Sequence, residues 1–363
     1  VANYVCAEDF ILEDGRVSGV RATDVVNGES LNIKADYVIN AAGPWIPLLN
    51  KSISTRSIVT AFSKGAHLVT SPVTQDVAVA LPTQKQNQSI VNRGGRHVFV
   101  IPWRGHSLIG TTYDPYAGEL DKVRPTEDDI EELISDINSA FGKTVLQRKD
   151  VKYSFAGIYP LVDDEINIKV YQGTGEYQIV DHNITDNIDG LITVFGAKFT
   201  TARLLAEKAL DQLVDKFTKP LKPCQTKTLP LVSGDIVSVK EYRKLKQHEY
   251  AGVLPENVID HLVTYYGTDI DAVVKYVSSD MRWKQTLTTN HPDIEAQIIY
   301  AIEHEMACHL DDILFRRTGL GTLGHPGNEV IERCADIMSD SLQWDHEKRQ
   351  SEIERVLSYY QFG

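Results

Sequence analysis

The feature that most constrains the fold of this chain is a short strand that passes through a glycine turn into an amphipathic helix. Residues 191–195 form a largely apolar run, which is too short for a helix and typical of a buried strand. After Gly196 and Lys198, Thr200 or Thr201 is placed to cap a helix. The apolar stripe of that helix consists of Ala202, Leu205, Ala206, Ala209, Leu213 and Phe217. This unit predicts an α/β arrangement for part of the chain.

The composition sets the protein class. A chain of 363 residues is long enough for two or three domains, and its 42% hydrophobic and 24% charged residues are typical of a globular protein. The net charge of −13 argues against binding to nucleic acid. No apolar run reaches about 18 residues, so no membrane-spanning helix is expected, although peripheral membrane contact stays open. The four cysteines have no CxxC spacing, which favours reduced thiols in a cytoplasmic protein over a disulfide or zinc framework.

The first 113 residues read almost entirely as strands. A β-meander is predicted over residues 2–41, and Asn27-Gly28 is its hairpin turn because both residues tolerate positive φ. The last strand runs into Ala42-Gly43-Pro44-Trp45, where small residues let a ligand approach the backbone closely. Further strands are predicted over residues 66–70, 77–81, 97–101 and 107–110.

Helices follow in two blocks. Thr126 and Asp129 resemble a capping box, and Gly142 suits the C-terminal end of the helix that they begin. Residues 151–171 look extended, and three prolines mark residues 218–237 as a linker. From Lys240 the periodicity is helical. Pro255 and Gly267 bound one helix, and a second is predicted from Ile294, Ile298, Ile302, Leu310 and Ile313.

Lys198 is the first candidate for chemistry. A helix N-terminus presents unpaired N–H groups and partial positive charge, and Lys198 adds a full charge just before one. Such a turn can stabilise negative charge that develops on a substrate or cofactor. The alternative is an ordinary connection that carries a solvated lysine.

Six segments, in the same order along the chain, resemble the FAD-dependent glycerol-3-phosphate dehydrogenases of the DAO-type flavoprotein superfamily. Each segment alone is weakly diagnostic, but together they span nearly the whole sequence. They are residues 36–45 (DYVINAAGPW), 64–67 (KGAH), 109–114 (IGTTYD), 156–161 (AGIYPL), 195–203 (FGAKFTTAR) and 312–321 (DILFRRTGLG).

The resemblance implies a fold and an activity. The expected fold class is mixed α/β, with a partial Rossmann-like FAD-binding domain (residues 1–50 and 184–218) interleaved with a mixed-sheet substrate domain (51–183). A linker (219–237) and an all-α C-terminal domain (238–363) follow. The implied activity is oxidation of sn-glycerol 3-phosphate to dihydroxyacetone phosphate by hydride transfer to FAD, with electrons passed to quinone or a partner subunit. A cytoplasmic protein, peripheral on the inner face of the membrane and able to form a homodimer, fits that role.

The resemblance also implies site residues. His67 lies where the family has a histidine on the substrate side, and a neutral histidine suits transfer of the hydroxyl proton; a structural hydrogen bond is the alternative. Lys198 and the turn amides would face the flavin or substrate. The implied cofactor-binding residues are Ala42, Gly43, Trp45, Gly196, Ala197, Lys198, Phe199 and Thr200. The implied substrate-binding residues are His67, Thr112, Tyr159 and Arg203.

Two departures from the family pattern qualify these expectations. The dinucleotide fingerprint GxGxxG, with the acidic residue that should follow it, is absent. Because the chain begins with Val1 in strand-like sequence, we expect a segment that carries both to precede it, and expect this chain alone to be an incomplete enzyme. Tyr159 replaces the family's arginine, a phosphate ligand, and supplies no charge.

That replacement keeps two alternatives open: a related oxidoreductase acting on an amino acid or another hydroxy acid, and a non-catalytic flavoprotein subunit. A metal site at His304, Glu305 and His309 is not expected, because the two histidines are five residues apart. The acid runs Asp163-Asp164-Glu165 and Asp311-Asp312 are interpreted as solvated faces or helix ends. Arg316-Arg317 is interpreted as a salt-bridged helix end, and Tyr359-Tyr360 as helix packing.

Overall fold

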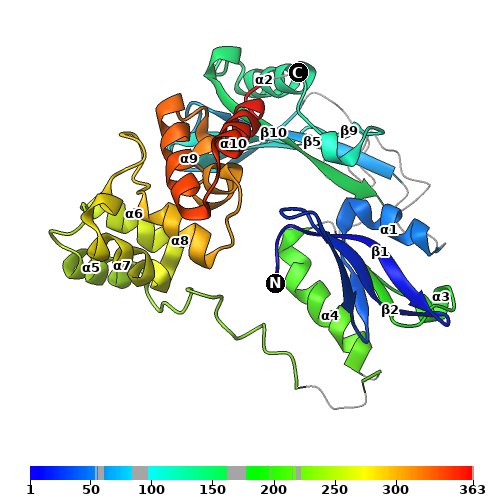
Figure 1. Ribbon diagram of the computed structural model, residues 1–363. Helices are drawn as coiled ribbons and strands as arrows, with labels where there is room; N and C mark the ends of the chain where they lie inside the picture. Colours follow the sequence, from blue (N-terminus) through cyan, green and yellow to red (C-terminus); the bar gives the residue numbers. More distant parts are fainter. Residues whose placement is uncertain are drawn as a thin grey trace. The chain divides into compact units, whose positions relative to one another are not determined.

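The computed structural model describes residues 1–53, 55, 61–83, 97–161, 177–196, 198–214, 216–217 and 222–361. The chain divides between Thr226 and Lys227 into two compact units, which are described separately below. This division falls within the segment 219–237 that was predicted as a linker. The structure confirms the mixed α/β class, with sheets in the first unit and helices in the second (Figure 1).

The predicted meander is present for its first three strands, which form an antiparallel sheet, but its last strand, Val38–Asn40, belongs to another sheet and pairs in parallel with residues 191–193. Gly28 turns the second hairpin with φ of 74°, and Asp14 and Gly15 turn the first, also at positive φ. The strands are β1 (Val5–Glu13), β2 (Arg16–Asp24) and β3 (Glu29–Lys34).

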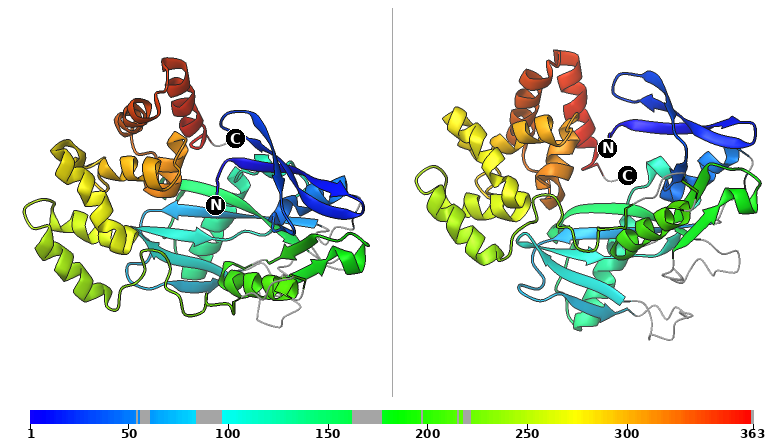
Figure 2. Two further views of the ribbon diagram at one scale, coloured as in Figure 1. Left: turned by 60° about the horizontal axis from the view of Figure 1, so that its bottom comes forward. Right: turned by 90° about the horizontal axis from the view of Figure 1, so that it is seen from below.

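A second sheet contains the predicted buried strand at residues 191–195. Its order is β11–β12–β4, and β12 runs parallel to β4, although these strands come from opposite ends of the unit. Neighbouring residues of β12 face opposite sides: Leu191 packs with Phe10 and Val17 of the meander, while Ile192 packs with Ala209 and Leu213 of α4. The strands and the helices beside them can be followed in Figure 2. They are β4 (Val38–Asn40), η1 (Gly43–Trp45), α1 (Ile46–Ser52), β11 (Gln178–Asp181), α3 (His182–Thr185), β12 (Leu191–Phe195), η4 (Phe199–Thr201) and α4 (Ala202–Val214).

The largest sheet has the order β10–β5–β8–β7–β6, and β9 also pairs with β5. It was expected to be mixed, but every pairing between its described strands is antiparallel. Between β7 and β8, for example, the turn at Arg104-Gly105 reverses the chain at positive φ. The strands are β5 (Ala61–Thr70), β6 (Val79–Pro82), β7 (His97–Trp103), β8 (His106–Gly110), β9 (Asp114–Pro115) and β10 (Val151–Leu161).

Helix α2 (Glu127–Phe141) covers one face of this sheet (Figure 1). Ile130, Leu133 and Ile137 of α2 are fully buried against Leu68 and Ile109. The predicted ends are confirmed: Thr126 and Asp129 form the capping box, and Gly142 ends the helix at φ of 65°. The 3₁₀ turns η2 (Leu120–Lys122) and η3 (Arg148–Asp150) flank α2.

The second unit is helical. Helix α6 begins after Pro255 and ends before Gly267, as predicted. The single helix expected from Ile294 to Ile313 is wrong: the chain leaves α8 after His304, turns at Met306 with φ of 55°, and re-enters a helical turn at Asp312. The elements are α5 (Val239–Glu249), α6 (Glu256–Tyr266), η5 (Gly267–Asp269), α7 (Ile270–Ser279), η6 (Met281–Lys284), α8 (Ala296–His304), the π-helical turn η7 (Asp312–Arg317), η8 (Leu320–Leu323), α9 (Asn328–Leu342) and α10 (His346–Ser358).

The letters GxGxxG do occur once, at Gly319, Gly321 and Gly324, but not between a strand and a helix. They follow η7, and a Cβ on Gly321 would lie 2.8 Å from the ring of Phe315, so this glycine serves packing. The absence of the fingerprint therefore holds only for the strand–loop–helix form that binds dinucleotides. Among the described residues, no helix is both long enough and apolar enough to cross a membrane.

Candidate active site

The parallel strands β4 and β12 have their carboxyl ends at the same end of their sheet, here called the β4–β12 edge. Val38 pairs with Leu191 and Asn40 with Thr193, so both strands end on the same side of their sheet. Beyond this edge lie the turn Ala42–Trp45 and the turn that begins at Gly196. Ligands of open α/β sheets bind outside the carboxyl ends of parallel strands. The predicted cofactor-binding segments therefore lie together at a place suited to a ligand.

The turn after β4 is fixed by hydrogen bonds on its inner side, and its outer side is open. The buried side chain of Asn40 accepts the N–H of Ala42 at 3.1 Å and donates to Asn50 at 3.0 Å. Gly43 has φ of 54°, and no atom lies within 4 Å of the place where its Cβ would be. Trp45 Nε1 donates to Asp121 at 3.1 Å. A flat ligand can thus approach the outer side of this turn.

The turn after β12 presents its side chains to solvent. Lys198, Phe199 and Thr200 are exposed, and Phe199 is fully exposed. Within the described chain, no hydrogen bond or ion pair holds Lys198 Nζ. Gly196 lets α4 approach, because a Cβ there would lie 2.7 Å from Leu205. Ala197 lies outside the described residues.

The helix start differs from the expected threonine cap. The chain enters α4 through the 3₁₀ turn η4, and the Thr201 hydroxyl donates to the carbonyl of Lys198 at 3.1 Å instead of accepting a backbone N–H. The backbone at Lys198 is therefore fixed by the turn that follows it, while its side chain extends outward.

His67 lies on the face of the large sheet opposite α2. Its strand register places Gly110 of β8 on one side and Phe155 of β10 on the other. The imidazole stacks on Phe155, with ring centroids 5.1 Å apart and planes 4° apart. Burial lowers the pKa of His67 below its ordinary value of 6.5. The neutral form, which can accept a proton, is therefore favoured at physiological pH.

Gly110 and Phe155 position this histidine, and neither was predicted as a site residue. A Cβ on Gly110 would lie 2.2 Å from His67 Cδ2, so only glycine leaves room for the ring. Sequence alone could reveal this only with the β5–β8 register, which places Gly110 opposite His67.

The other predicted substrate-binding residues are placed differently. Tyr159 lies two residues beyond Gly157 on β10, opposite Ser63, and its hydroxyl oxygen is buried. Thr112 is fully buried, and its hydroxyl binds Asp129 and the N–H of Ala66. Arg203 pairs with Glu207 at 2.7 Å on the surface of α4. Of these, Thr112 has the contacts of a structural residue.

A small apolar cluster joins the β4–β12 edge to the strand that carries His67. Phe195 at the end of β12 and Ile46 at the start of α1 are buried together, and Ala42 and Phe62 pack against them. Phe62 belongs to β5, the strand that carries His67. The β4–β12 edge is therefore packed against the strand of the candidate base. Within the described residues, no hydrogen bond joins Lys198 to His67, and no group of three or more His, Cys, Asp or Glu side chains is placed to hold a metal ion.

The role of Gly110 in positioning the His67 imidazole can be tested by substitution. We expect Gly110→Ala to leave the fold intact but displace the imidazole, because a flexible side chain is what the new methyl group meets. A misplacement of about 1 Å costs about 100-fold in rate when the residue is catalytic. Turnover and a crystal structure of the variant would measure this. Gly157→Ala is the matched control, since no atom lies within 4 Å of its Cβ position; equal losses in both variants would contradict a special role for Gly110.

Comparison with known proteins identifies the class. The family described as FAD dependent oxidoreductase matches residues 3–212, and the C-terminal domain of alpha-glycerophosphate oxidase matches residues 224–349. The chain belongs to the FAD dependent oxidoreductase family, which confirms the resemblance inferred from its six segments.

Several proteins named glycerol-3-phosphate dehydrogenase match nearly the whole of this chain. The chain is 31% identical to a probable mitochondrial glycerol-3-phosphate dehydrogenase of Dictyostelium discoideum, over 95% of this chain and 53% of the relative. It is 30% identical to the aerobic glycerol-3-phosphate dehydrogenase of Bacillus subtilis, over 98% of this chain and 63% of the relative. The solved glycerol-3-phosphate dehydrogenase from Bacillus halodurans, complexed with FAD, matches with a TM-score of 0.82 at 26% identity, over 99% of this chain and 68% of that one. The chain thus spans about half to two thirds of the length of the curated relatives it matches.

Proposed function

We propose that this chain takes part in the FAD-dependent oxidation of sn-glycerol 3-phosphate to dihydroxyacetone phosphate. The observation that carries the proposal is the packing of the β4–β12 edge against β5, the strand on which a neutral, stacked His67 lies. The relatives that match nearly the whole of this chain are named as glycerol-3-phosphate dehydrogenases, which supports the same activity.

The residues at the β4–β12 edge fit the ring end of FAD. Gly43 leaves its outer side open, and the exposed turn Lys198–Thr200 adds a cation next to a helix start. Ala42, Gly43 and Trp45 would hold one side of the cofactor, and Gly196 to Thr200 the other. FAD, when bound, supplies the acceptor for the hydride that leaves C2 of the substrate.

The chain's own groups have two tasks in this reaction. His67 accepts the proton of the C2 hydroxyl, for which the neutral imidazole is required. Lys198 and nearby N–H groups place positive charge where negative charge grows as the hydride is transferred. Phe155 and Gly110 keep the imidazole in one orientation.

Recognition of the phosphate is the part that departs from the family pattern. Tyr159 occupies the position of the family's arginine, so a phosphate would gain no charge there. This replacement favours, as a second candidate, a related oxidoreductase that acts on an amino acid or another hydroxy acid. For either substrate we propose quinone or an electron-transfer subunit as the electron acceptor, with peripheral contact at the inner face of the membrane.

The deciding experiment uses the protein isolated from its natural source with its bound flavin. We expect anaerobic glycerol 3-phosphate to bleach the flavin absorbance. Bleaching only by amino or hydroxy acids would replace the proposal with the second candidate. If none of these compounds bleaches the flavin and the protein is isolated with a stable partner subunit, the chain has a non-catalytic role.

The contribution of Lys198 is a separate prediction. Lys198→Ala should lower turnover by more than about tenfold without unfolding the protein, because the loss of one charge-stabilising donor costs about 3 kcal/mol at the transition state. Steady-state kinetics and thermal unfolding measure the two effects. Lys208→Ala, which removes an exposed lysine paired with Asp211 on the same helix, is the control. If both variants are equally active, the ammonium of Lys198 has no part in the reaction.

A further inference from the structure

Asp129 joins three elements beneath the sheet that carries His67. Its carboxylate is buried and accepts from Lys64 of β5 at 2.6 Å, and from the N–H and hydroxyl of Thr126 at 2.7 and 2.8 Å. Its other oxygen accepts from the Thr112 hydroxyl, in the segment after β8, at 3.3 Å. Only the bonds to Thr126 are needed to cap α2. The bonds to Lys64 and Thr112 lead toward the candidate site.

The charge of Asp129 is maintained by these donors. Burial alone would raise the pKa of Asp129, but hydrogen bonds from Lys64 and Thr126 outweigh it and hold the pKa below the ordinary value of 3.8. The partner Lys64 is itself largely buried, with 12% of its side chain exposed. The pair is therefore a buried, hydrogen-bonded ion pair, and removal of one partner leaves the other uncompensated.

Thr112 passes this constraint to β5. The Thr112 hydroxyl accepts the N–H of Ala66 at 2.9 Å, and the Thr112 N–H donates to the carbonyl of Ala66 at 3.3 Å. Ala66 directly precedes His67. Next to it, the Thr111 hydroxyl lies 2.6 Å from the Cβ position of Gly65, so Thr111 occupies the space that this glycine leaves. These contacts fix the chain after Gly110 against Gly65 and Ala66 of β5.

We propose that Asp129 is a positioning residue for His67. Asp129 acts through Thr112 and Lys64, which hold the Gly110–Thr112 segment against β5. The relevance to catalysis rests on the proposed function, in which His67 is the base. The placement of the imidazole, however, is a property of this chain alone and is measured without flavin or substrate.

The test observes the His67 ring directly. The full chain is prepared with ¹³C-labelled histidine, and the His67 signal is identified by its loss in His67→Gln. The Phe155 ring shields the stacked imidazole, so displacement of the ring moves this signal downfield. In Asp129→Asn we expect that shift, together with a rise of the His67 pKa toward its ordinary value of 6.5, because the displaced ring becomes more exposed to water.

Substitutions at Thr112 separate a specific effect on the position of His67 from a general loss of fold stability. Thr112→Val removes the hydroxyl at nearly constant shape and should produce the same shift of the His67 signal. Thr112→Ser keeps the hydroxyl and should leave the signal at its parent position. If Asp129→Asn does not fold, this pair of variants still decides the question.

Asn138→Ala is the matched destabilising control. Asn138 forms three hydrogen bonds at the other end of α2, to Val145 and Leu146, at 2.8 to 2.9 Å. Its loss should lower stability without moving the His67 signal. The proposal is overturned if folded Thr112→Val, or folded Asp129→Asn, leaves the His67 signal unshifted, or if Asn138→Ala moves it equally. Failure of glycerol 3-phosphate to bleach the flavin would refute the proposed function and leave this result unaffected.

Discussion

Replacement of His67 by glutamine is expected to lower the turnover of the flavin-loaded enzyme by about 10²- to 10⁴-fold, the usual contribution of a positioned general base. Glutamine fits the same space but cannot take a proton. The remaining rate should depend on solvent hydroxide and therefore rise steadily with pH. The measurement is the pH profile of kcat/KM in the parent and variant.

The expected position of the acid limb follows from the burial of His67. Because burial lowers its pKa below 6.5, the imidazole stays neutral to a lower pH than an exposed histidine would. The parent should therefore keep its activity to below pH 6.5 and lose it as His67 becomes protonated at lower pH. That limb should be absent in His67→Gln.

His97→Gln provides the control, since His97 is an exposed histidine at the start of β7 in the same sheet. It should keep the parent profile. An acid limb that survives in His67→Gln would assign the proton transfer to another group.

The fold could be predicted where a local signal sufficed. The Asn27-Gly28 hairpin and the α2 capping box were identified correctly because positive φ and N-terminal capping are determined by a few adjacent residues. The continuous helix across Met306 was predicted wrongly because the apolar spacing persists through the break. A local and a tertiary contact mark that position: Asp312 accepts the N–H groups of Cys308 and His309 and starts a new turn, and Glu352 of α10 accepts the N–H of Leu310.

The candidate site was only partly accessible from the sequence. His67 and Lys198 were selected by motif, but strand register determines what surrounds the histidine, and register joins residues far apart in the chain. Thr112 illustrates the limit. Its motif suggested contact with substrate, and the structure shows its hydroxyl bound to Asp129 and Ala66.

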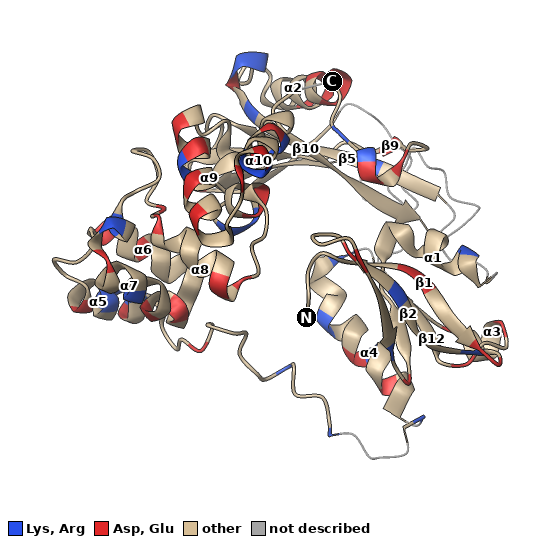
Figure 3. Ribbon diagram, viewed as in Figure 1, with Lys and Arg blue, Asp and Glu red and all other residues tan. Residues whose placement is uncertain are grey.

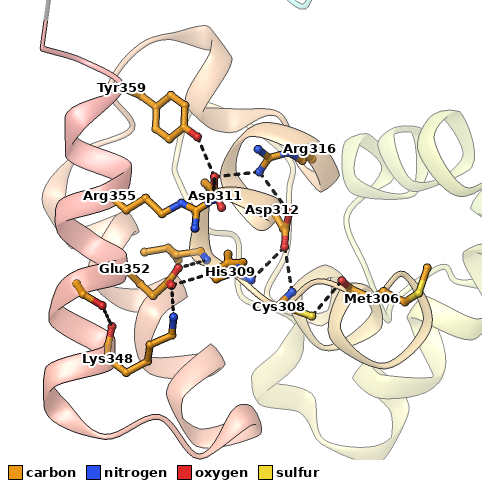
Figure 4. Close-up of polar contacts among 12 residues, drawn as sticks. Met306, Cys308, His309, Asp311, Asp312, Arg316, Lys348, Glu352, Arg355 and Tyr359 are labelled. Atoms are coloured by element: carbon orange, nitrogen blue, oxygen red, sulfur yellow. Dashed lines mark hydrogen bonds and ion pairs between the residues drawn. The ribbon is translucent and has the colours of Figure 1, made fainter. Parts of the chain in front are cut away.

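The interpretation of Asp311-Asp312 as a helix end is confirmed, because Asp311 is the N-terminal cap residue of η7 and Asp312 is its first residue. Arg316 does form ion pairs, at 3.1 Å to Asp311 and 3.2 Å to Asp312, and both signs of charge lie along α9 and α10 (Figure 3). Asp311, however, is fully buried, because Arg316, Arg355 and Tyr359 all approach one of its oxygens (Figure 4). Asp163-Asp164-Glu165 lies outside the described residues. Charge compensation between distant segments, which no local pattern reveals, is what makes such burial tolerable.

The same polar cluster contains another buried acid. Glu352 of α10 is buried and accepts from His309 Nδ1 at 2.7 Å, the Leu310 N–H at 3.0 Å and Lys348 at 2.7 Å (Figure 4). Burial alone would raise the pKa of Glu352, but these three hydrogen bonds outweigh it and lower the pKa to about 2. The carboxylate thus links α10 to the segment before η7.

Glu352→Ala is expected to lower the free energy of unfolding of the second unit by about 3–5 kcal/mol. It removes the acceptor of two buried donors, the imidazole of His309 and the N–H of Leu310, and each such loss costs about 1–3 kcal/mol. Lys348 is 41% exposed and can be solvated, so it adds little. Urea unfolding of the full chain, followed through amide hydrogen exchange of α9 and α10, isolates this unit. Glu354→Ala, at an exposed acid two residues further along the same helix, should change stability by less than about 0.5 kcal/mol.

The effect should also depend on pH with a defined sign. The folded-state pKa of about 2 lies below the ordinary value of 4.5, so the stabilising contribution of Glu352 is complete above pH 4.5 and is lost as the pH falls from 4.5 toward 2. The difference in unfolding free energy between the parent and Glu352→Gln should therefore shrink over that range, because glutamine does not titrate. A difference that stays constant from about pH 6 to 3 would mean that the carboxylate charge contributes nothing, and that shape and packing alone hold α10 in place.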